Sequence, residues 1–317
     1  MRVVFMGTPD FAVPSLEGLL QSRHEVAGVV SNPDRPSGRG RRKKPSPVKE
    51  LALEHGLPLL QPENLEEPVF LQAIREMKPD IQVVVAFRML PGSLLDLPPY
   101  GSINLHASLL PAYRGAAPIQ RALMEGVEQS GVTTFFIDEG MDQGHILLQK
   151  GIEIPADMTA GELHDRLAEL GRDVLLDTLE QLEKGSLIPT PQKEPASSVP
   201  KAPKIGPSDR KLDWTGSATR LHDRIRAMSP SPGIQSELRG KGSSSIRLKI
   251  LKAEPEKKSS SSKATPGTVL EVRDDRLVVA TGDGELGILQ LQPAGKRSMS
   301  VEAFLRGYRV EAGDRFL

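Results

Sequence analysis

The sequence predicts an α/β protein in which a Rossmann-like, doubly wound, mostly parallel sheet is followed by a small OB-like β-barrel domain. In the first half, short β-branched or apolar segments alternate with helical segments, as in parallel sheets covered by helices. In the last third, short strands are separated by glycine turns, as in small barrels. With 317 residues, the chain has the length of about two domains.

Five segments of the first half are predicted strands because they are short and apolar or β-branched along most of their length. The fourth and fifth are expected to be adjacent and parallel, so that the polar residues after them meet at one edge of the sheet. The five segments are 2–6, 26–30, 81–86, 102–105 and 132–137.

Helical segments separate these strands, and capping residues mark their starts. Ser46 is a suitable N-cap and is followed by proline at the first helical position. Thr159 and Glu162 form a capping box at the start of the longest helix, which ends at Gly185. We interpret the apolar stripe of that helix as core packing. The other predicted helices of this half begin at Pro14 and Pro118.

Composition divides the chain into three parts. Residues 1–187 form the predicted catalytic domain, and the proline density of 188–209 is typical of an extended linker. Residues 210–317 form the predicted barrel domain, in which a helix over 217–228 precedes the strands. The predicted strands are 246–251, 268–272, 277–281 and 286–291, and 240–245 and 257–263 are low-complexity loops.

The formal net charge of zero conceals an asymmetry. Residues 1–199 hold 19 Lys+Arg against 27 Asp+Glu, a net of −8, whereas residues 200–317 hold 22 against 14, a net of +8. This asymmetry favours a polyanionic partner at the basic end. Chance clustering of solvated charges is the alternative.

Several classes of protein are excluded or disfavoured. The absence of cysteine excludes disulfides, thiolate metal sites and a cysteine nucleophile. No apolar run approaches the roughly 20 residues of a membrane span, and no signal peptide is recognisable, so we expect a cytoplasmic protein with no membrane partner. Gly7 stands alone after the first strand, which disfavours NAD and FAD, and no P-loop motif is present.

Asn104 and His106 are the first candidate catalytic residues. They are two positions apart, so in an extended strand their side chains project to the same face. An amide donor beside an imidazole can stabilise a developing oxyanion and handle a proton. The alternative is that the pair only forms hydrogen bonds within its own loop.

Asp142 is the third candidate. It lies between two glycines in the polar loop 138–145, which follows the fifth predicted strand. Beside Asn104 and His106, its carboxylate could orient the imidazole and relay a proton. A solvated acidic turn is the alternative. A metal site formed by Asp142 and His145 is disfavoured because a third ligand is missing.

The loop 35–44 carries six positive charges and no negative charge within an otherwise acidic domain. Its charge suits contacts with nucleic-acid phosphates, and a solvated loop without a partner is the alternative. The candidate nucleic-acid contacts are Arg35, Arg39, Arg41, Arg42, Lys43 and Lys44.

Taken in order, these segments resemble the methionyl-tRNA formyltransferase family of folate-dependent enzymes, nearly end to end. The stretch 104–120 resembles the folate formyltransferase signature, and 140–144 resembles the loop of the catalytic aspartate. The turn 87–90 differs from the family's usual turn and resembles the folate-lining loop of glycinamide ribonucleotide formyltransferase. The other matching segments are 4–12, 35–49, 202–205, 291–296 and 304–307.

The resemblance implies formyl transfer from 10-formyltetrahydrofolate to the α-amino group of methionyl initiator tRNA, by a monomer that needs no metal. It implies that Asn104 and His106 stabilise the oxyanion and that Asp142 handles the proton. It places tRNA on the basic loop and the carboxyl-terminal barrel. The residues implied in folate binding are Ser108, Leu109, Leu110, Pro111, Phe87, Arg88, Met89 and Leu90.

Three other functions remain open on the sequence. A formyltransferase acting on an amino sugar or nucleotide would share the three candidate catalytic residues but would not need the basic loop. A hydrolase that releases formate from the same folate is the second. A catalytically silent tRNA-binding protein is the third, and the complete set of catalytic side chains argues against it.

Overall fold

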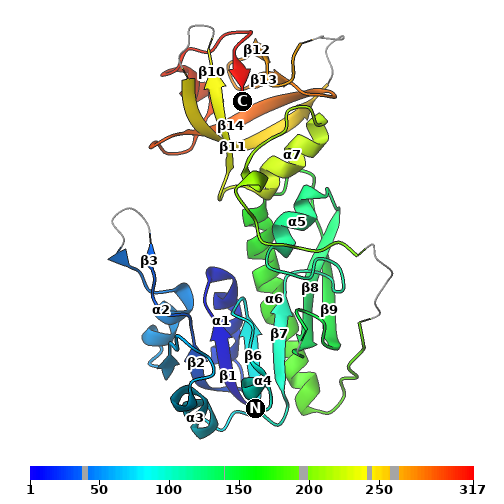
Figure 1. Cartoon of the computed structure of the whole chain (residues 1–317). Coiled ribbons are helices and arrows are strands. Elements are labelled where there is room, and N and C mark those ends of the chain that lie inside the picture. The colour runs from blue at the N-terminus through cyan, green and yellow to red at the C-terminus, as the bar shows by residue number, and fades with distance from the viewer. Residues whose placement is uncertain (38–41, 139, 193–198, 241–244, 258–263) are drawn as a thin grey trace. The chain divides into compact units, whose positions relative to one another are not determined.

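The computed structural model describes residues 1–37, 42–138, 140–192, 199–240, 245–257 and 264–317 (Figure 1). The chain forms two compact units. The first comprises residues 1–118, 129–153 and 164–201, and the second comprises 119–128, 154–163 and 202–317.

The first unit is built on a seven-stranded sheet with the order β5-β2-β1-β6-β7-β8-β9. From β5 to β7 all neighbours are parallel, whereas β8 and β9 run antiparallel to their neighbours. The mostly parallel sheet is therefore confirmed. Its strands are β1 (Arg2–Gly7), β2 (Glu25–Val30), β5 (Leu59–Leu60), β6 (Ile81–Val85), β7 (Ser102–His106), β8 (Gln129–Phe136) and β9 (Ile146–Glu153).

Helices cover both faces of this sheet. Val4, Met6 and Val84 pack against side chains of α3 (Pro68–Glu76) and α4 (Gly92–Leu95) on one face. On the other face, α6 (Ala160–Glu183) lies so close to β7 that a Cβ atom at Gly171 would be 2.6 Å from Leu105 Cδ2. Because side chains alternate along a strand, Asn104 and His106 point away from α6. Two further helices are α1 (Val13–Gln21) and α2 (Pro47–Glu54).

The expectation that the fourth and fifth predicted strands are parallel is wrong. Phe136, at the end of β8, is paired with Ile103, at the start of β7. The loop after β8 therefore begins at the opposite end of β7 from His106, and it must turn back along β7 to reach that side chain. Apolar composition identifies a buried strand but does not give its direction.

The predicted capping signals are present where the sequence placed them. The Ser46 hydroxyl accepts a hydrogen bond from the amide of Lys49 at the start of α2. At the start of α6, the Glu162 carboxylate accepts from the Thr159 amide at 2.8 Å, and the Thr159 hydroxyl accepts from the Glu162 amide at 3.3 Å. The predicted helix from Pro118 is α5 (Pro118–Met124).

The second unit contains a nearly closed antiparallel barrel, which confirms the predicted second architecture. Its main strand order is β12-β13-β14-β11-β10-β16, and β15 pairs with β14. An antiparallel bridge between Thr268 and Arg315 joins the two ends of this order. The strands are β10 (Ile234–Arg239), β11 (Ser245–Glu256), β12 (Val269–Val272), β13 (Leu277–Ala280), β14 (Glu285–Pro293), β15 (Met299–Ser300) and β16 (Arg315–Phe316).

Helix α7 (Ala218–Ala227) contributes Leu221 and Ile225 to the barrel core, and α8 (Val301–Leu305) contributes Phe304. The Ser217 hydroxyl caps α7. The sequence reasoning did not predict the short or edge elements α3, α4, α8, β5, β9, β10, β15 and β16. Within the loops predicted over 240–245 and 257–263, residues 241–244 and 258–263 lie outside the described residues.

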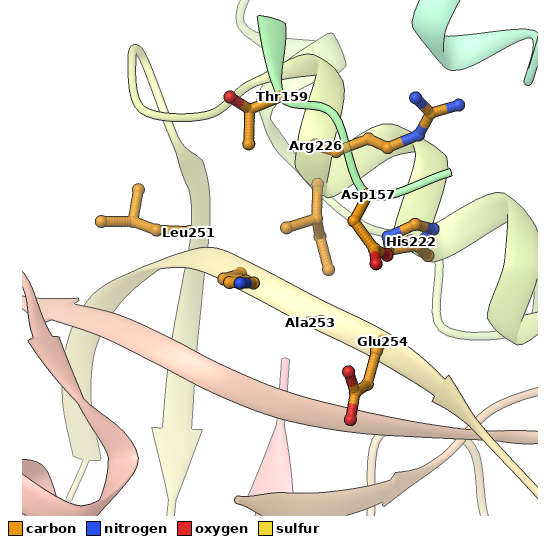
Figure 2. Close-up of a pocket in the computed structure, with 9 residues that line it drawn as sticks. Asp157, Thr159, His222, Arg226, Leu251, Ala253 and Glu254 are labelled. Atoms are coloured by element: carbon orange, nitrogen blue, oxygen red, sulfur yellow. Dashed lines mark ion pairs between the residues drawn. The ribbon is translucent and has the colours of Figure 1, made fainter. Parts of the chain in front are cut away.

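A small pocket in the second unit lies between α7, β11 and the segment before α6 (Figure 2). His222 is buried there, with its Nε2 atom 3.4 Å from Asp157 Oδ1. Burial lowers the pKa of His222 below its usual value because the charged imidazolium loses hydration, while Asp223 acts in the opposite direction.

In the part of the chain that the structure describes, no helix is long and apolar enough to cross a membrane.

The lowered pKa of His222 predicts a loss of stability in acid. The unfolded chain takes up a proton near pH 6.5, above the pH at which the folded protein does so, so the free energy of unfolding falls as the pH decreases below about 6.5. Thermal unfolding at pH 7.5 and pH 5.5 measures this. His222→Gln should show a smaller fall in midpoint than the wild type. Part of the fall should remain, because burial also lowers the pKa of His24. Exposed His55 provides the control. If the unfolding midpoint of His55→Gln fell as little between pH 7.5 and pH 5.5 as that of His222→Gln, this assignment would be contradicted.

Candidate functional site

His106 stands at the end of β7, and its orientation is set by a backbone carbonyl. Its Nε2 atom lies 2.9 Å from the carbonyl oxygen of Tyr113. A carbonyl can only accept, so Nε2 carries the proton and Nδ1 faces the other way. The imidazole is almost fully buried. Tyr113 is held at φ +61°, a conformation uncommon for a bulky side chain.

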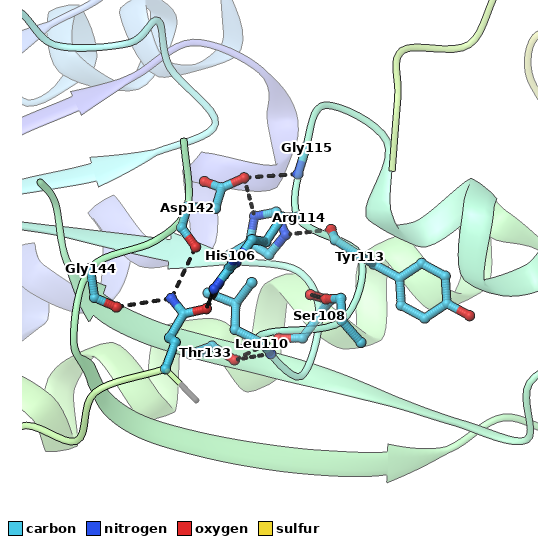
Figure 3. A network of polar contacts seen from close by, with 11 residues as sticks. His106, Ser108, Leu110, Tyr113, Arg114, Gly115, Thr133, Asp142 and Gly144 are labelled. Carbon is cyan, nitrogen blue, oxygen red and sulfur yellow. Dashed lines mark hydrogen bonds and ion pairs between the residues drawn. The ribbon is translucent and has the colours of Figure 1, made fainter. Parts of the chain in front are cut away.

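Asp142 lies on the Nδ1 side of the same ring (Figure 3). Its Oδ2 atom is 3.9 Å from His106 Nδ1 and accepts a hydrogen bond of 2.8 Å from the backbone amide of Gly115. Asp142 has φ +54°, which aspartate tolerates better than most residues. The structure therefore brings together two residues that lie 36 positions apart, although His106 ends β7 and Asp142 follows β8, which runs antiparallel to β7.

Asn104 shares the face of His106, two residues away on β7. Its side chain is half-buried, and within the described part of the chain it makes no hydrogen bond. Its amide is therefore free to donate to a ligand. The three candidate catalytic side chains differ in this respect, since His106 and Asp142 are held by other groups and Asn104 is not.

Gln192 is a part of the site that the sequence reasoning missed, because it lies in the predicted linker. Its Nε2 atom donates to the carbonyl oxygens of Asp142 and Gly144, at 2.9 Å each. Its Oε1 atom accepts from Arg114 Nε at 3.0 Å and from Arg114 NH2 at 2.7 Å. One amide thus ties the aspartate loop to the loop after β7. Nothing in the local sequence pattern signals this contact.

A second cluster fixes the start of the loop after β7 (Figure 3). The buried Thr133 hydroxyl donates to the carbonyl of Ser108 at 2.6 Å and accepts from the amide of Leu110 at 3.1 Å. Gln149 Nε2 donates to the Leu110 carbonyl at 2.8 Å and to Thr133 Oγ1 at 2.9 Å. These side chains come from β8 and β9, so the antiparallel strands support the loop from its side.

The first group of candidate folate residues is contiguous in this loop. The hydroxyl of Ser108 donates to the carbonyl of Ala112 at 2.6 Å, and Ser108 and Leu110 are almost fully buried. Leu109 and Pro111 are half-buried. In the structure, Ser108 and Leu110 therefore shape the loop, and the more accessible side chains of the four are Leu109 and Pro111.

The second group forms the turn after β6, which starts at Ala86 with φ +48°. Arg88 donates to the carbonyls of Glu63 at 2.8 Å and Pro62 at 2.7 Å, and its guanidinium lies 5.4 Å from the centre of the Phe87 ring. Burial lowers the pKa of Arg88 below its usual value, but a guanidinium remains charged at neutral pH. Met89 is 69% exposed and Leu90 is buried.

Lys49 anchors the base of the candidate nucleic-acid loop, which covers residues 35–44. Lys49 Nζ binds Asp34 Oδ2 at 2.7 Å and Gln61 Oε1 at 2.8 Å. Above this base, β3 (Pro36–Ser37) and β4 (Arg42–Lys43) pair as a short antiparallel hairpin. Arg35 and Lys44 are exposed. Arg39 and Arg41 lie outside the described residues.

This arrangement has the parts needed for acyl-type transfer to an amine. Asn104 offers a free amide donor, His106 offers an oriented imidazole, and Asp142 offers a carboxylate that can accept a proton. Three backbone conformations with positive φ border the site, at Ala86, Tyr113 and Asp142. Such conformations cost free energy and cluster at functional sites. Among the described residues, no group of three or more potential metal ligands is present.

Comparison with protein families gives two matches along the chain. Residues 1–179 match the family model described as formyl transferase, and residues 204–309 match the model described as formyl transferase, C-terminal domain.

Curated relatives cover the whole chain. A methionyl-tRNA formyltransferase from Heliobacterium modesticaldum is 45% identical over 100% of both chains. Another from a Methylobacterium species is 46% identical over 99% of both. Among solved structures, HypX from Aquifex aeolicus in complex with tetrahydrofolic acid aligns with a TM-score of 0.64 and 20% identity, over 99% of this chain and 50% of that one. This last likeness supports the fold.

The Thr133 cluster predicts a substitution that damages the site through its loop. Thr133→Val should leave the Leu110 amide without an acceptor and the Ser108 carbonyl without a donor, each at a cost of about 1–3 kcal/mol, while Gln149 Nε2 keeps only its bond to the Leu110 carbonyl. Urea unfolding of the variant should show a lower midpoint than that of Thr265→Val, which alters an exposed threonine. Equal midpoints in the two variants would show that the cluster does not support the loop.

Proposed function

The chain belongs to the formyl transferase family, and on that premise we propose that it transfers the formyl group of 10-formyltetrahydrofolate to the α-amino group of methionyl initiator tRNA. Its product would be N-formylmethionyl-tRNA for translation initiation. The observation that carries the proposal is the convergence of Asn104, His106 and Asp142 in a chain whose full length matches curated methionyl-tRNA formyltransferases.

We propose the following roles for the three side chains. The side-chain N–H groups of Asn104, which have no hydrogen-bond acceptor among the described residues, donate to the formyl oxygen. That oxygen gains negative charge when the amine attacks the formyl carbon. His106 faces the same side, and its imidazolium form adds positive charge there. Asp142 stabilises that imidazolium from the Nδ1 side and accepts the proton that the amine loses, directly or through water. As the tetrahedral adduct collapses, the bond from the formyl carbon to N10 of the folate breaks, and that nitrogen takes up the proton and leaves as tetrahydrofolate. The carbonyl of Tyr113 and the amide of Gly115 hold this pair in place.

The folate co-substrate supplies an activated formyl group when bound. The two loops around the site fit a folate, since they offer backbone groups together with apolar side chains. Arg88 Nε is buried without a partner among the described residues, so this turn also has an unused donor. The residues that would hold the co-substrate are Ser108, Leu109, Leu110 and Pro111 in one loop and Phe87, Arg88, Met89 and Leu90 in the other.

The remaining assignments are part of the same proposal. Residues 1–187 serve as the catalytic domain, 188–209 as the linker and 210–317 as a tRNA-binding domain. The loop 35–44 contacts tRNA phosphates through Arg35, Arg39, Arg41, Arg42, Lys43 and Lys44. The protein acts as a cytoplasmic monomer, without a metal. The positive charge of the loop and of the carboxyl-terminal third supports the assignment of both to tRNA binding.

A formyl-transfer assay tests the proposal directly. The purified chain is incubated with 10-formyltetrahydrofolate and either methionyl initiator tRNA, methionyl elongator tRNA or an amino-sugar nucleotide. Formylation of the initiator substrate in preference to the other two is expected. Preference for the amino sugar would replace the proposed substrate, and release of formate without an acceptor would indicate a hydrolase.

Asn104→Ala should reduce kcat by about 10²–10³-fold, because one oxyanion donor is lost. Steady-state kinetics with saturating folate and tRNA measure the effect. Asn64→Ala is the matched control, since Asn64 is exposed and caps only its own turn through the Glu66 amide. Turnover near that of the wild type in a folded Asn104→Ala protein would remove Asn104 from the mechanism.

Neutralising the basic loop should separate binding of the two substrates. The triple change of Arg41, Arg42 and Lys43 to alanine should weaken tRNA binding and lower the slope of log K against log salt by about 0.7–0.9 for each lost phosphate contact. Folate binding should stay unchanged. The control is the same change at Arg75, Lys150 and Lys184, which are exposed on other elements. Equal loss of tRNA and folate binding would contradict this division of roles.

A further inference from the structure

We propose that Arg114 binds a phosphodiester of the acceptor end of the tRNA and that Gln192 holds its guanidinium for this purpose. This inference rests on the proposed function. It assigns an anion-binding group beside the reacting residues. This group lies in the first unit and not in the basic carboxyl-terminal third. Neither residue belongs to the basic loop or to the candidate folate loops.

The first observation is the state of the Arg114 charge. The guanidinium is half-buried, and its Nε and NH2 atoms both donate to the neutral amide oxygen of Gln192, at 3.0 and 2.7 Å. Within the described residues, Arg114 has no carboxylate partner. A partly buried charge without a counter-charge is unfavourable unless a ligand supplies one.

Three other buried or half-buried arginines contrast with Arg114, whereas Arg88 resembles it in donating to neutral amide carbonyls, which at Arg88 belong to the backbone. Arg121 is paired with Asp209 at 2.9 Å, and Arg226 is paired with Asp223 at 2.8 Å. Arg276 contacts three carboxylates. At those positions the protein supplies its own counter-ion. At Arg114 an amide occupies the place of the carboxylate, which orients the guanidinium without neutralising it.

The second observation is the position of Arg114. The same Gln192 amide donates to the carbonyls of Asp142 and Gly144, and the amide of Gly115 donates to the Asp142 carboxylate. Arg114 is therefore linked to Asp142, the proposed proton acceptor, through Gln192 and through its chain neighbour Gly115 (Figure 3). An anion bound by Arg114 would lie beside the place where the amine reacts.

The chemistry of the two substrates favours a phosphodiester as that anion. The reacting amine belongs to an amino acid esterified to the terminal ribose, so a phosphate of the terminal nucleotides is the nearest anionic group. In the folate, the glutamate carboxylates lie at the far end of the molecule from the pterin. The planar guanidinium fork suits phosphate oxygens.

Binding of uncharged initiator tRNA at several salt concentrations tests the inference without relying on turnover. Arg114→Gln should weaken binding about tenfold at low salt, because a charge-assisted contact is lost. It should also lower the slope of log K against log salt by about 0.7, the value for one phosphate of a single strand. Folate binding should stay at the wild-type level. Arg75→Gln, on the exposed side of α3, should change neither quantity.

Two further variants keep the test informative if Arg114→Gln folds poorly. Gln192→Glu loses the two bonds that Gln192 donates to the carbonyls of Asp142 and Gly144, and it introduces a counter-ion for Arg114. It should lower the salt slope as Arg114→Gln does, with the arginine intact. Arg114→Lys keeps the charge and loses the fork, so it should retain the slope while binding more weakly. Thermal unfolding establishes that each variant is folded.

An unchanged salt slope in folded Arg114→Gln and Gln192→Glu would overturn the inference. So would weaker folate binding with unchanged tRNA binding, which would assign Arg114 to the folate carboxylates. The proposed function fails in a different way, namely if the wild-type chain formylates no aminoacyl-tRNA. Formylation of initiator tRNA by the wild type, combined with an unchanged slope in the variants, would reject only the role of Arg114.

Discussion

The hydrogen bond from His106 to the carbonyl of Tyr113 is the constraint on which the site depends. It assigns the proton to Nε2, and it therefore directs Nδ1 at Asp142. If the neutral imidazole carried its proton on Nδ1 instead, the lone pair of Nε2 would face a carbonyl oxygen, which is repulsive. The strained backbone of Tyr113 is retained because this bond and the packing around it compensate for its cost.

The rest of the site consists of supports for that geometry. The antiparallel strands β8 and β9 hold the start of the loop after β7 through Thr133 and Gln149. Gln192 then ties the other end of that loop to the aspartate loop. Neutral amides and hydroxyls make these connections, so they add no charge beside His106 and Asp142.

The arginines of the described chain differ in whether a carboxylate neutralises them. Arg121 and Arg226 each have such a partner. At Arg35, Lys44 and Arg114, positive charge lacks such a partner among the described residues. An overall charge of zero therefore includes cations that no carboxylate of the described residues neutralises.

The sequence by itself determined the two architectures and the capped helices, because these follow from local periodicity and capping chemistry. It selected Asn104 and His106 as candidates through their spacing along one strand, but it placed Asp142 beside them through a parallel strand pairing that the structure does not have. It did not determine the direction of β8 or the short edge strands, since the apolar content of a short segment is independent of its direction and edge strands carry weak patterns. Only the tertiary structure decided that the aspartate loop turns back to His106 and that Gln192 joins it to Arg114. Those contacts link residues 27 to 78 positions apart, and they arise from chain packing that no local pattern records.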